Sequence, residues 1–504
     1  MSSPINEQAA PSDASATRRG DVAIALKNTV KLGASLLITW TVALVVRFQL
    51  PRHLGPETFG QLNFCDAFAG AFFVFIGLGV DTYIQKEIPV RPKHATEFFG
   101  GILLARALLS VPLLAMLAFT LAATGHPAEL QIVAIVFGLN HFVYALNNSF
   151  STMLQSSTKV GALAIVNVAS KVMWGVGLVA AIWMDAKLVV LAATFLISEL
   201  VRTALLLPAL RSTIGLKLEL HFDTAKRALI ASLPFYGTMV AINLGHRLDV
   251  SMLEFMASHI EVGWYSAAAN FATLAMLLSP LVSWVLMPLL ARARHRSLEE
   301  FFAILRRALE AILVTAIPVT LMMALGADFW VHLAFGESFA PSAPTLQLMA
   351  PMFVATYLAM LCSNALILLG RPWLLTIVSV VGLCVGPMLI LAMVPLLSGY
   401  GPGGAGMGAA LGLVGTESFI AGLLLYFVGK SAFDRRSVSA ISKSVLLCVA
   451  VSFLHVALAG LGAWRLLIDI LVYTAGALAT GAVEPSAVRE VARMLFQRKA
   501  PGSS

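Results

Sequence analysis

Charged residues are scarce in this sequence. Asp, Glu, Lys and Arg make up 12% of its 504 residues, against about 25% in an ordinary soluble domain. Hydrophobic residues make up 59%, and the mean hydropathy is +0.87. This composition excludes a water-soluble enzyme or binding domain. Because backbone groups in lipid must be satisfied within their own segment, it predicts an all-α integral membrane protein.

Cysteine is also rare, and its distribution argues against two kinds of site. The four cysteines all lie in apolar runs and show no paired spacing: Cys65, Cys362, Cys384 and Cys448. A disulfide framework or a zinc site would need closely spaced pairs. The glycine-rich stretch GPGGAG at 401–406 follows no strand, unlike a phosphate-binding P-loop. We therefore expect no metal and no cofactor.

Long polar loops are missing as well, so no soluble domain of any size is expected. A helix needs about 20 apolar residues to cross the hydrocarbon core of a bilayer, and runs of this length predict about fourteen transmembrane spans. They begin near Leu32, Leu62, Phe98, Leu130, Gly161, Leu188, Ala228, Val262, Phe302, Ala343, Leu374, Ala405, Ile441 and Arg465.

The basic residues orient these spans. Most of the 34 Lys and Arg residues lie at the two termini and at the ends of even-numbered spans. The opposite loops hold only Arg52, Lys187 and Arg465. By the positive-inside rule, both termini are cytoplasmic, in a multi-pass protein of the bacterial cytoplasmic membrane. The net charge of +8 thus reflects topology, and no nucleic-acid partner is expected.

A few ionisable residues fall inside the spans, where charge is costly and usually functional. The basic ones are Arg47, Arg106, Lys171, Arg202 and Arg247, and the acidic ones are Asp66, Glu199, Asp249 and Glu417. We expect the basic side chains to face a cavity, and Lys171 to pair with Glu199 from the adjacent span. Asp81, near the inner end of the second span, is expected to be interfacial.

Polar side chains accompany these charges at helical spacing. In the fourth span they form one stripe with His141 on its edge: Asn140, Tyr144, Asn147, Asn148 and Ser151. In the seventh span, Tyr236, Asn243 and Arg247 share a face, whereas Asp249 lies on another face with His246. The alternative interpretation is that Asn and Ser only join helices, at about 0.6 kcal/mol per contact.

The chain also contains a weak internal repeat. The stretch after the first span, HLGPETFGQLNFCDAFAG, aligns with ASHIEVGWYSAAANFAT after the seventh, so that Phe59-Gly60 falls on Val262-Gly263. A six-span interval puts both copies on the same side of the membrane. This is typical of a transporter built from parallel repeats about an axis along the membrane normal.

Four stretches carry a family resemblance: LGPETFG at 54–60, IGLGVDTYIQKEI at 76–88, RLDVSMLEFMASHIEVGWYSAAANF at 247–271 and GYGPGGAGMGAAL at 399–411. In order and spacing they resemble the polysaccharide-exporter branch of the multidrug/oligosaccharidyl-lipid/polysaccharide (MOP) flippases, which includes Wzx-like O-antigen and exopolysaccharide flippases. Residues 1–22 are polar and rich in Ser, Ala and Pro, so we expect them to be a disordered cytoplasmic tail. The resemblance implies two six-helix lobes in a V (23–210 and 211–430), followed by two further spans with a tail (431–504).

The same resemblance implies a cargo and its binding residues. The cargo would be a polyprenyl-diphosphate-linked oligosaccharide for cell-surface polysaccharide, passed on to a polymerase and chain-length machinery. The cationic residues Arg47, Arg106, Lys171, Arg202 and Arg247 would hold the diphosphate in a central cavity. Asn140, Tyr144, Asn147 and Asn243 would line it.

Two alternatives stay open. A cation-coupled drug or metabolite antiporter of the same superfold would have a more acidic cavity, whereas here the basic residues inside spans outnumber the acidic ones. A membrane-embedded glycosyltransferase would need a sizeable catalytic loop, so we expect no enzyme. For ion or proton coupling, the candidates are Glu199, Asp249, Glu417 and His141, because a buried carboxyl can exchange protons near neutral pH.

Overall fold

The computed structural model describes residues 12–91, 94–157, 160–274 and 279–482, and these residues form helices and turns with no strand among them. The all-α prediction is confirmed. The chain divides into two compact units, each described separately below. Unit 1 comprises Met1–Arg47 and Phe75–Tyr236, and unit 2 comprises Phe48–Val74 and Gly237–Ser504. The units differ from the predicted division in the segments 48–74, 211–236 and 431–504, and the lobe division stays a prediction. The part of the predicted disordered tail that the structure describes, residues 12–22, is helical.

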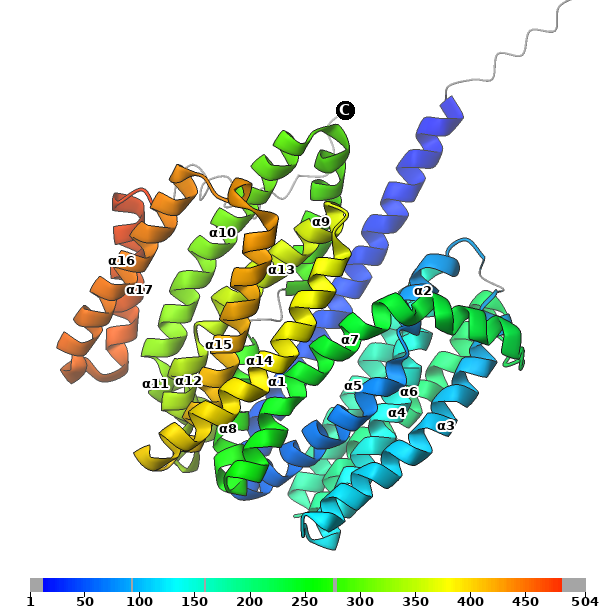
Figure 1. Cartoon of the computed structure of the whole chain (residues 1–504), viewed down its shortest axis with the longest axis horizontal. Helices are drawn as coiled ribbons and strands as arrows, with labels where there is room; N and C mark the ends of the chain where they lie inside the picture. Colours follow the sequence, from blue (N-terminus) through cyan, green and yellow to red (C-terminus); the bar gives the residue numbers. More distant parts are fainter. Residues whose placement is uncertain (1–11, 92–93, 158–159, 275–278, 483–504) are drawn as a thin grey trace, which may run out of the picture. The chain divides into compact units, whose positions relative to one another are not determined.

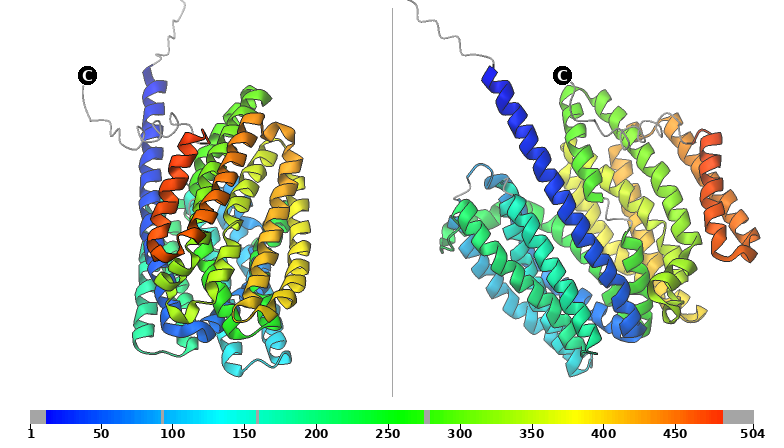
Figure 2. Two further views of the ribbon diagram at one scale, coloured as in Figure 1. Left: turned by 90° about the vertical axis from the view of Figure 1, so that its left-hand side faces the viewer. Right: turned by 180° about the vertical axis from the view of Figure 1, so that it is seen from behind.

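Unit 1 is built around helices that run side by side (Figures 1 and 2). It contains the first part of α1 (Ser12–Phe73) and the first part of α7 (Phe222–Met256). Between these segments the helices are α2 (Val80–Glu87), α3 (His94–Ala123), α4 (Ala128–Ser156), α5 (Val160–Trp183) and α6 (Leu188–Ile214).

Unit 2 holds the remainder of α1 and α7 together with the C-terminal helices (Figure 1). These are α8 (His259–Ala272), α9 (Ser279–Arg296), α10 (Leu298–Leu325), α11 (Ala327–Phe335), α12 (Ser342–Met349), α13 (Met352–Leu368), α14 (Pro372–Leu397), α15 (Gly404–Val428), α16 (Arg435–Ala457) and α17 (Arg465–Ala479). Short 3-10 turns connect several of them, at Val74–Gly77, Glu337–Phe339, Ser398–Tyr400, Lys430–Ala432 and Ala459–Trp464.

The described residues contain eleven helices long and apolar enough to cross a membrane, or twelve if the two bent halves of α7 form one span. The predicted first and second spans fall together in one stretch, Leu37–Gly77, although Gly55 has non-helical dihedral angles. The predicted eighth span is divided between α8 and α9. The number fourteen therefore stays a prediction.

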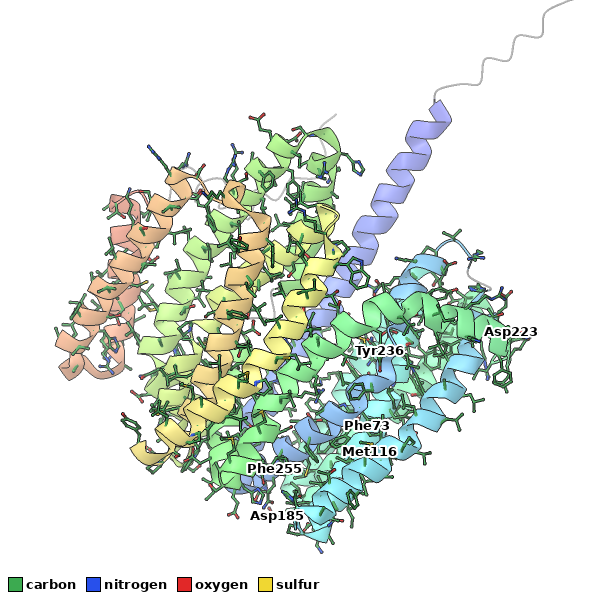
Figure 3. All side chains as sticks on the ribbon, viewed as in Figure 1. Phe73, Met116, Asp185, Asp223, Tyr236 and Phe255 are labelled. Carbon is green, nitrogen blue, oxygen red and sulfur yellow. The ribbon has the colours of Figure 1, made fainter. Side chains whose placement is uncertain are left out.

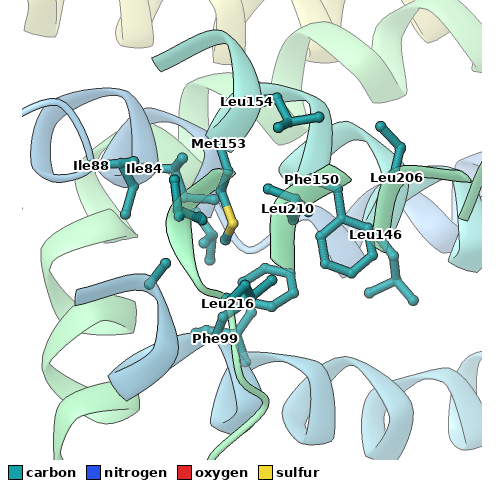
Figure 4. Packing of buried hydrophobic residues seen from close by; sticks show 14 of the residues in the cluster. Ile84, Ile88, Phe99, Leu146, Phe150, Met153, Leu154, Leu206, Leu210 and Leu216 are labelled. Atoms are coloured by element: carbon teal, nitrogen blue, oxygen red, sulfur yellow. The ribbon is translucent and has the colours of Figure 1, made fainter. Parts of the chain in front are cut away.

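The core of unit 1 is apolar and is formed by side chains repeating at helical spacing (Figure 4). Ile84 of α2 and Ile88, which follows α2, belong to one cluster with Phe99 of α3 and with Phe150 and Met153 of α4. Many large apolar side chains point outward instead: Met116 of α3 is 56% exposed (Figure 3). An outward apolar surface of this kind matches a helix that faces lipid, where no hydrophobic force drives it inward.

The glycine-rich stretch 399–411 allows two helices of unit 2 to approach closely. Gly408 and Gly412 lie four residues apart on one face of α15 and contact α14. A Cβ at Gly408 would lie 2.5 Å from the Met393 carbonyl oxygen, and one at Gly412 would lie 3.0 Å from the Ile390 nitrogen. Small residues at this spacing are typical of close helix packing in membranes.

The internal repeat has a structural counterpart within unit 2. Gly60 packs on the carbonyl oxygen of His259, and Gly263 packs on that of Pro56; a Cβ at either glycine would lie 1.9 Å from the oxygen. As many positions separate Pro56 from His259 as separate Gly60 from Gly263. The two copies of the repeat therefore contact each other through equivalent residues.

We expect Gly60→Ala to destabilise this contact strongly. The added methyl group would meet the His259 backbone, and overpacking of this kind costs about 1–3 kcal/mol. Gly422→Ala is a matched control, since Gly422 also lies in a helix of unit 2 and a Cβ there meets nothing within 4 Å. Thermal unfolding of both purified variants checks the prediction, and equal stability of the two would contradict it.

Candidate functional site

A network of polar side chains joins α4 and α6 in unit 1. Asn147 is completely buried. Its Nδ2 donates to Oε2 of Glu199 (2.7 Å) and to the Glu199 carbonyl oxygen (2.8 Å). Its Oδ1 accepts a hydrogen bond from Thr203 Oγ1 (2.8 Å). Because every polar group of Asn147 is used, this residue fixes the position of Glu199.

Arg202 extends the network to a third helix. Its Nη2 donates to Ser151 Oγ of α4 (3.1 Å) and to Asn167 Oδ1 of α5 (3.2 Å). Its Nη1 lies 3.5 Å from Glu199 Oε2, one turn earlier on α6. The guanidinium thus cross-links three helices, and its planar fork suits such multiple contacts better than a lysine ammonium would.

Lys171 is placed differently from the prediction. Its Nζ lies over the ring of Trp174, 3.6 Å from the centroid, whereas the ion-pair partner of Glu199 is Arg202. Glu199 also attracts Lys171 electrostatically, so the expected pairing of these two side chains stays a prediction. Arg202 is three residues from Glu199 on the same helix, so it reaches the carboxylate without depending on how α5 and α6 are aligned.

Lys171 nevertheless belongs to a group of charges. It interacts electrostatically with Arg47 and Arg202, which repel it, and with Glu199, which attracts it. We call Arg47, Lys171, Arg202 and Glu199 the cation cluster of unit 1. It brings together three of the predicted basic residues and one acidic residue, which is a formal charge of +2.

Arg106 lies apart from this cluster and has no exposed surface. Its Nη1 donates to Ser149 Oγ (3.0 Å) and to the Ala145 carbonyl oxygen (3.1 Å), and its Nη2 donates to the Gly77 carbonyl oxygen (3.0 Å). Gly77 ends a helical turn just before Leu78 and Gly79, both with positive φ. Arg106 was expected to face a cavity; instead it satisfies a carbonyl at a break in the helix, as irregular backbone in a membrane requires.

Asp81 completes this second polar group. It accepts hydrogen bonds from Asn148 Nδ2 and Ser149 Oγ, both at 2.5 Å, and it interacts electrostatically with Arg106. Asp81 is therefore part of a polar group within unit 1, whereas its position near the end of a predicted span indicates only an interfacial residue. The break at Leu78-Gly79 separates Asp81 from the preceding helix, so helical periodicity gave no signal for it.

The other polar residues of unit 1 that were predicted to line a cavity do not lie together around one cavity. Asn140 is 8% exposed and its Oδ1 has no hydrogen-bond partner, whereas Tyr144 is 51% exposed. His141 is partly exposed. Tyr236, labelled in Figure 3, donates from its hydroxyl to the Phe75 carbonyl oxygen (3.1 Å). The predicted stripe on α4 thus divides between the cation cluster, the Asp81 group and the exposed surface.

In unit 2, Arg247 lies on the backbone of the second predicted span. Its Nη1 donates to the Asp66 carbonyl oxygen (3.3 Å) and lies 4.0 Å from Asp66 Oδ2. A Cβ at Gly70 would lie 2.1 Å from the same nitrogen, so the guanidinium packs directly against this glycine. The Arg247 side chain stays 31% exposed. Asn243, predicted on the same face, is exposed and bonds to the Met239 carbonyl oxygen of its own helix.

Unit 2 also contains a cavity of about 360 Å³ among α7, α13, α14 and α15. Its polar lining consists of His246, Asp249, Thr356, Ser363, Ser379, Thr416 and Glu417. Asp249 is buried and accepts hydrogen bonds from Tyr265 Oη (2.5 Å) and from the Val250 backbone nitrogen (2.8 Å). Thr356 Oγ1 donates to Glu417 Oε2 (3.2 Å). Two of the predicted coupling residues therefore line one cavity.

The cation cluster of unit 1 and the cavity of unit 2 thus differ in the charge of their side chains. Unit 1 has a net positive cluster, which suits an anion. The unit 2 cavity has two carboxylates and a histidine, which suit a proton or a small cation. In the described part of the chain, no group of three or more His, Cys, Asp or Glu side chains is placed to hold a metal ion.

Comparisons with known proteins agree with this fold. Residues 25–294 match the family model described as "Polysaccharide biosynthesis protein". A structure of the lipid II flippase MurJ in an inward closed conformation is similar, with a TM-score of 0.70, 14% identity, and coverage of 93% of this chain and 100% of MurJ. No curated protein matches the sequence significantly.

Multidrug transporters share the fold less completely. An inward-facing MATE family transporter of the MOP superfamily gives a TM-score of 0.59 at 15% identity and covers 81% of this chain and 99% of that protein. The MATE transporter VcmN of Vibrio cholerae gives 0.55 at 15% identity, covering 80% and 96%. At such low identities, these likenesses concern the fold alone.

Proposed function

Because this chain belongs to the polysaccharide biosynthesis protein family of the MOP superfamily, we propose that it is a flippase for a polyprenyl-diphosphate-linked oligosaccharide. It moves this repeat unit across the bacterial cytoplasmic membrane by alternating access, for synthesis of a cell-surface polysaccharide such as O-antigen or exopolysaccharide. The observation that carries the proposal is the cation cluster of unit 1, where Arg47, Lys171 and Arg202 are opposed by the single carboxylate of Glu199.

The members of the cluster have different roles in this proposal. Arg202 is held by Ser151, Asn167 and Glu199, so it positions the site. Lys171 has an aromatic ring as its neighbour, and its ammonium can leave Trp174 for a stronger partner. A phosphate oxygen is such a partner, because charge-assisted hydrogen bonds are about twice as strong as neutral ones.

Arg247 supplies a second, weaker contact for the anionic cargo. Its guanidinium is partly exposed and pairs loosely with Asp66, so it can exchange that carboxylate for a phosphate. Arg106 is left out of the proposed site because it is fully buried and bonded to backbone.

The cavity of unit 2 is the proposed coupling site. Asp249 and Glu417 would take up a proton or a monovalent cation as the cargo moves, and the same cavity contains His246. Glu199 is a poorer candidate, because its carboxylate is bonded to Asn147 and Arg202. His141 is not among the residues that line this cavity.

We expect Asp249→Asn to remove the dependence of transport on an ion gradient. Asparagine keeps the shape of the side chain and still accepts from Tyr265, but it cannot bind a proton or balance a cation. The measurement is cargo flipping in proteoliposomes with and without proton and sodium gradients. Glu337→Gln is the control, since Glu337 is 83% exposed and lies outside the cavity. A gradient effect that persists in Asp249→Asn would exclude this residue from coupling.

A cation-coupled drug or metabolite antiporter is the second candidate. The acidic cavity of unit 2 favours it, since such a cavity can bind a cationic drug as well as a coupling ion. The net positive cluster of unit 1 does not, because it repels cations. Cells that lack the protein distinguish the two functions.

If the proposal is right, these cells accumulate the lipid-linked oligosaccharide on the cytoplasmic face and lose the surface polysaccharide, and their drug susceptibility is unchanged. Restored surface polysaccharide on re-expression would support the flippase. Increased drug susceptibility with normal surface polysaccharide would support the antiporter. The proposal also implies transfer of the cargo to a polymerase and chain-length machinery on the far side, with both termini of the flippase in the cytoplasm.

A further inference from the structure

An apolar groove runs between α1 and α5 in unit 1. It has a volume of about 430 Å³ and is lined by Val42, Val45 and Val46 of α1 and by Val172, Val176 and Trp183 of α5, among others. Val45 is 50% exposed, Val176 is 65% exposed and Trp183 is 84% exposed. An apolar groove with exposed walls on a membrane helix pair is open to lipid chains.

The groove owes its shape to a glycine. Gly175 lets α1 approach α5 so closely that a Cβ at this position would lie 2.7 Å from Val42 Cγ1. The side chains on either side are mostly valines, which are short and have restricted rotamers. The groove is therefore apolar and has stiff walls, which suit a hydrocarbon chain.

The groove adjoins the cation cluster. Arg47 follows the lining residue Val46, and Lys171 precedes the lining residue Val172. Lys171 also lies four residues before Gly175, so these two residues share a face of α5. The amphipathic combination of cations and an apolar groove matches a lipid with an anionic head and a long apolar chain.

A second apolar groove lacks this combination. It lies in unit 2, has a volume of about 460 Å³ and is lined by residues that include Phe271, Val319, Met322, Trp330 and Tyr473. As in the groove of unit 1, none of its lining residues is Lys or Arg, but here no Lys or Arg follows or precedes a lining residue in the sequence either. A chain attached to a diphosphate has no phosphate ligand at this groove, so charge complementarity favours the groove of unit 1.

We propose that the α1–α5 groove binds the first isoprene units of the polyprenyl chain while the attached diphosphate lies at Arg47 and Lys171. This inference rests on the proposed function, since it assigns the chain of that same cargo. It makes the N-terminal unit the part of the protein that recognises the lipid carrier, whatever glycan the carrier holds.

Photocrosslinking in nanodiscs tests the proposal. The probe is a short-chain polyprenyl diphosphate with a diazirine in its second isoprene unit, and the comparison probe is phosphatidylglycerol with a diazirine in its acyl chain. Crosslinks mapped by mass spectrometry are expected in residues 41–46 and 172–183. Val176→Trp fills the groove, and Val319→Trp, which changes a residue 43% exposed in the groove of unit 2, is the matched control.

We expect Val176→Trp to weaken saturable binding of the polyprenyl probe about tenfold, because the chain loses apolar burial. Val319→Trp should leave binding unchanged, and the phosphatidylglycerol probe should not compete. Crosslinks in the unit 2 groove, or weaker binding in Val319→Trp alone, would overturn the groove while leaving the flippase function intact. Equal labelling by both probes would also overturn it. If wild-type protein and Lys171→Gln bound the polyprenyl probe equally, the proposed diphosphate site would fail as well.

Discussion

Lys171→Ala is expected to reduce export of the lipid-linked glycan by about 10- to 100-fold, which corresponds to the loss of one charge-assisted contact of about 1.5–3 kcal/mol. Protein abundance should stay close to that of the wild type. Lys171 makes a cation–π contact with Trp174, and its removal leaves no buried carboxylate unpaired, because Glu199 keeps Arg202 as its partner. The measurement is surface polysaccharide per unit of membrane-inserted protein.

Two further variants sharpen this test. Lys171→Arg keeps the positive charge and should retain part of the export. Lys187→Ala removes an exposed lysine from the end of the same helix hairpin and should leave export unchanged. Normal export per molecule in Lys171→Ala would remove this residue from the binding site. A fall in abundance that accounts for the whole loss of export would assign it a structural role.

Arg106→Met should destabilise unit 1 by about 3 kcal/mol or more, since removing one partner of a buried charge pair is strongly destabilising. The Gly77 carbonyl oxygen would lose its donor and Asp81 would lose its compensating charge. We expect little folded protein in the membrane and a lower melting temperature for the part that inserts. Fluorescence-detected size-exclusion chromatography after heating provides the measurement.

Arg91→Met is the matched control for this variant. Arg91 pairs with Glu87 in the same unit, but its side chain is 61% exposed, and exposed ion pairs contribute at most about 1 kcal/mol. Adding Asp81→Asn to Arg106→Met should recover part of the stability, because the double variant leaves no uncompensated charge. An Arg106→Met protein with normal stability but no export would place Arg106 at the cargo after all.

The sequence predicts the elements of this fold well, because apolar runs of membrane length are an unambiguous pattern. It also predicts that Asn147 and Ser151 share a face of α4 and that Glu199 and Arg202 share a face of α6. Periodicity describes one helix at a time, however, and does not specify its neighbours. Lys171 was therefore assigned to Glu199, although Arg202 reaches that carboxylate from within its own helix.

Two other residues, Asp81 and Arg106, were misplaced because they lie next to or bond to an interruption between helices. Leu78 and Gly79 have positive φ and break the second predicted span, so the environments of Asp81 and Arg106 do not follow from spacing. At the glycine-rich stretch 401–406, the backbone N–H groups of Gly403 and Gly406 donate to the carboxylate of Glu261 at 2.7 and 3.1 Å. The N-terminus of α15 therefore binds the carboxylate of Glu261, and this role does not follow from the glycine motif alone.

Reconstituted flipping tests the central claim most directly. Purified protein is placed in proteoliposomes that contain a fluorescent polyprenyl-diphosphate oligosaccharide in both leaflets, and a membrane-impermeant reagent bleaches the outer leaflet. Wild-type protein should make nearly all of the probe accessible to the reagent, and Lys171→Ala should slow this markedly. If about half of the probe stayed protected with wild-type protein, as in liposomes without protein, while a cationic drug was exchanged for protons, the flippase function would be contradicted.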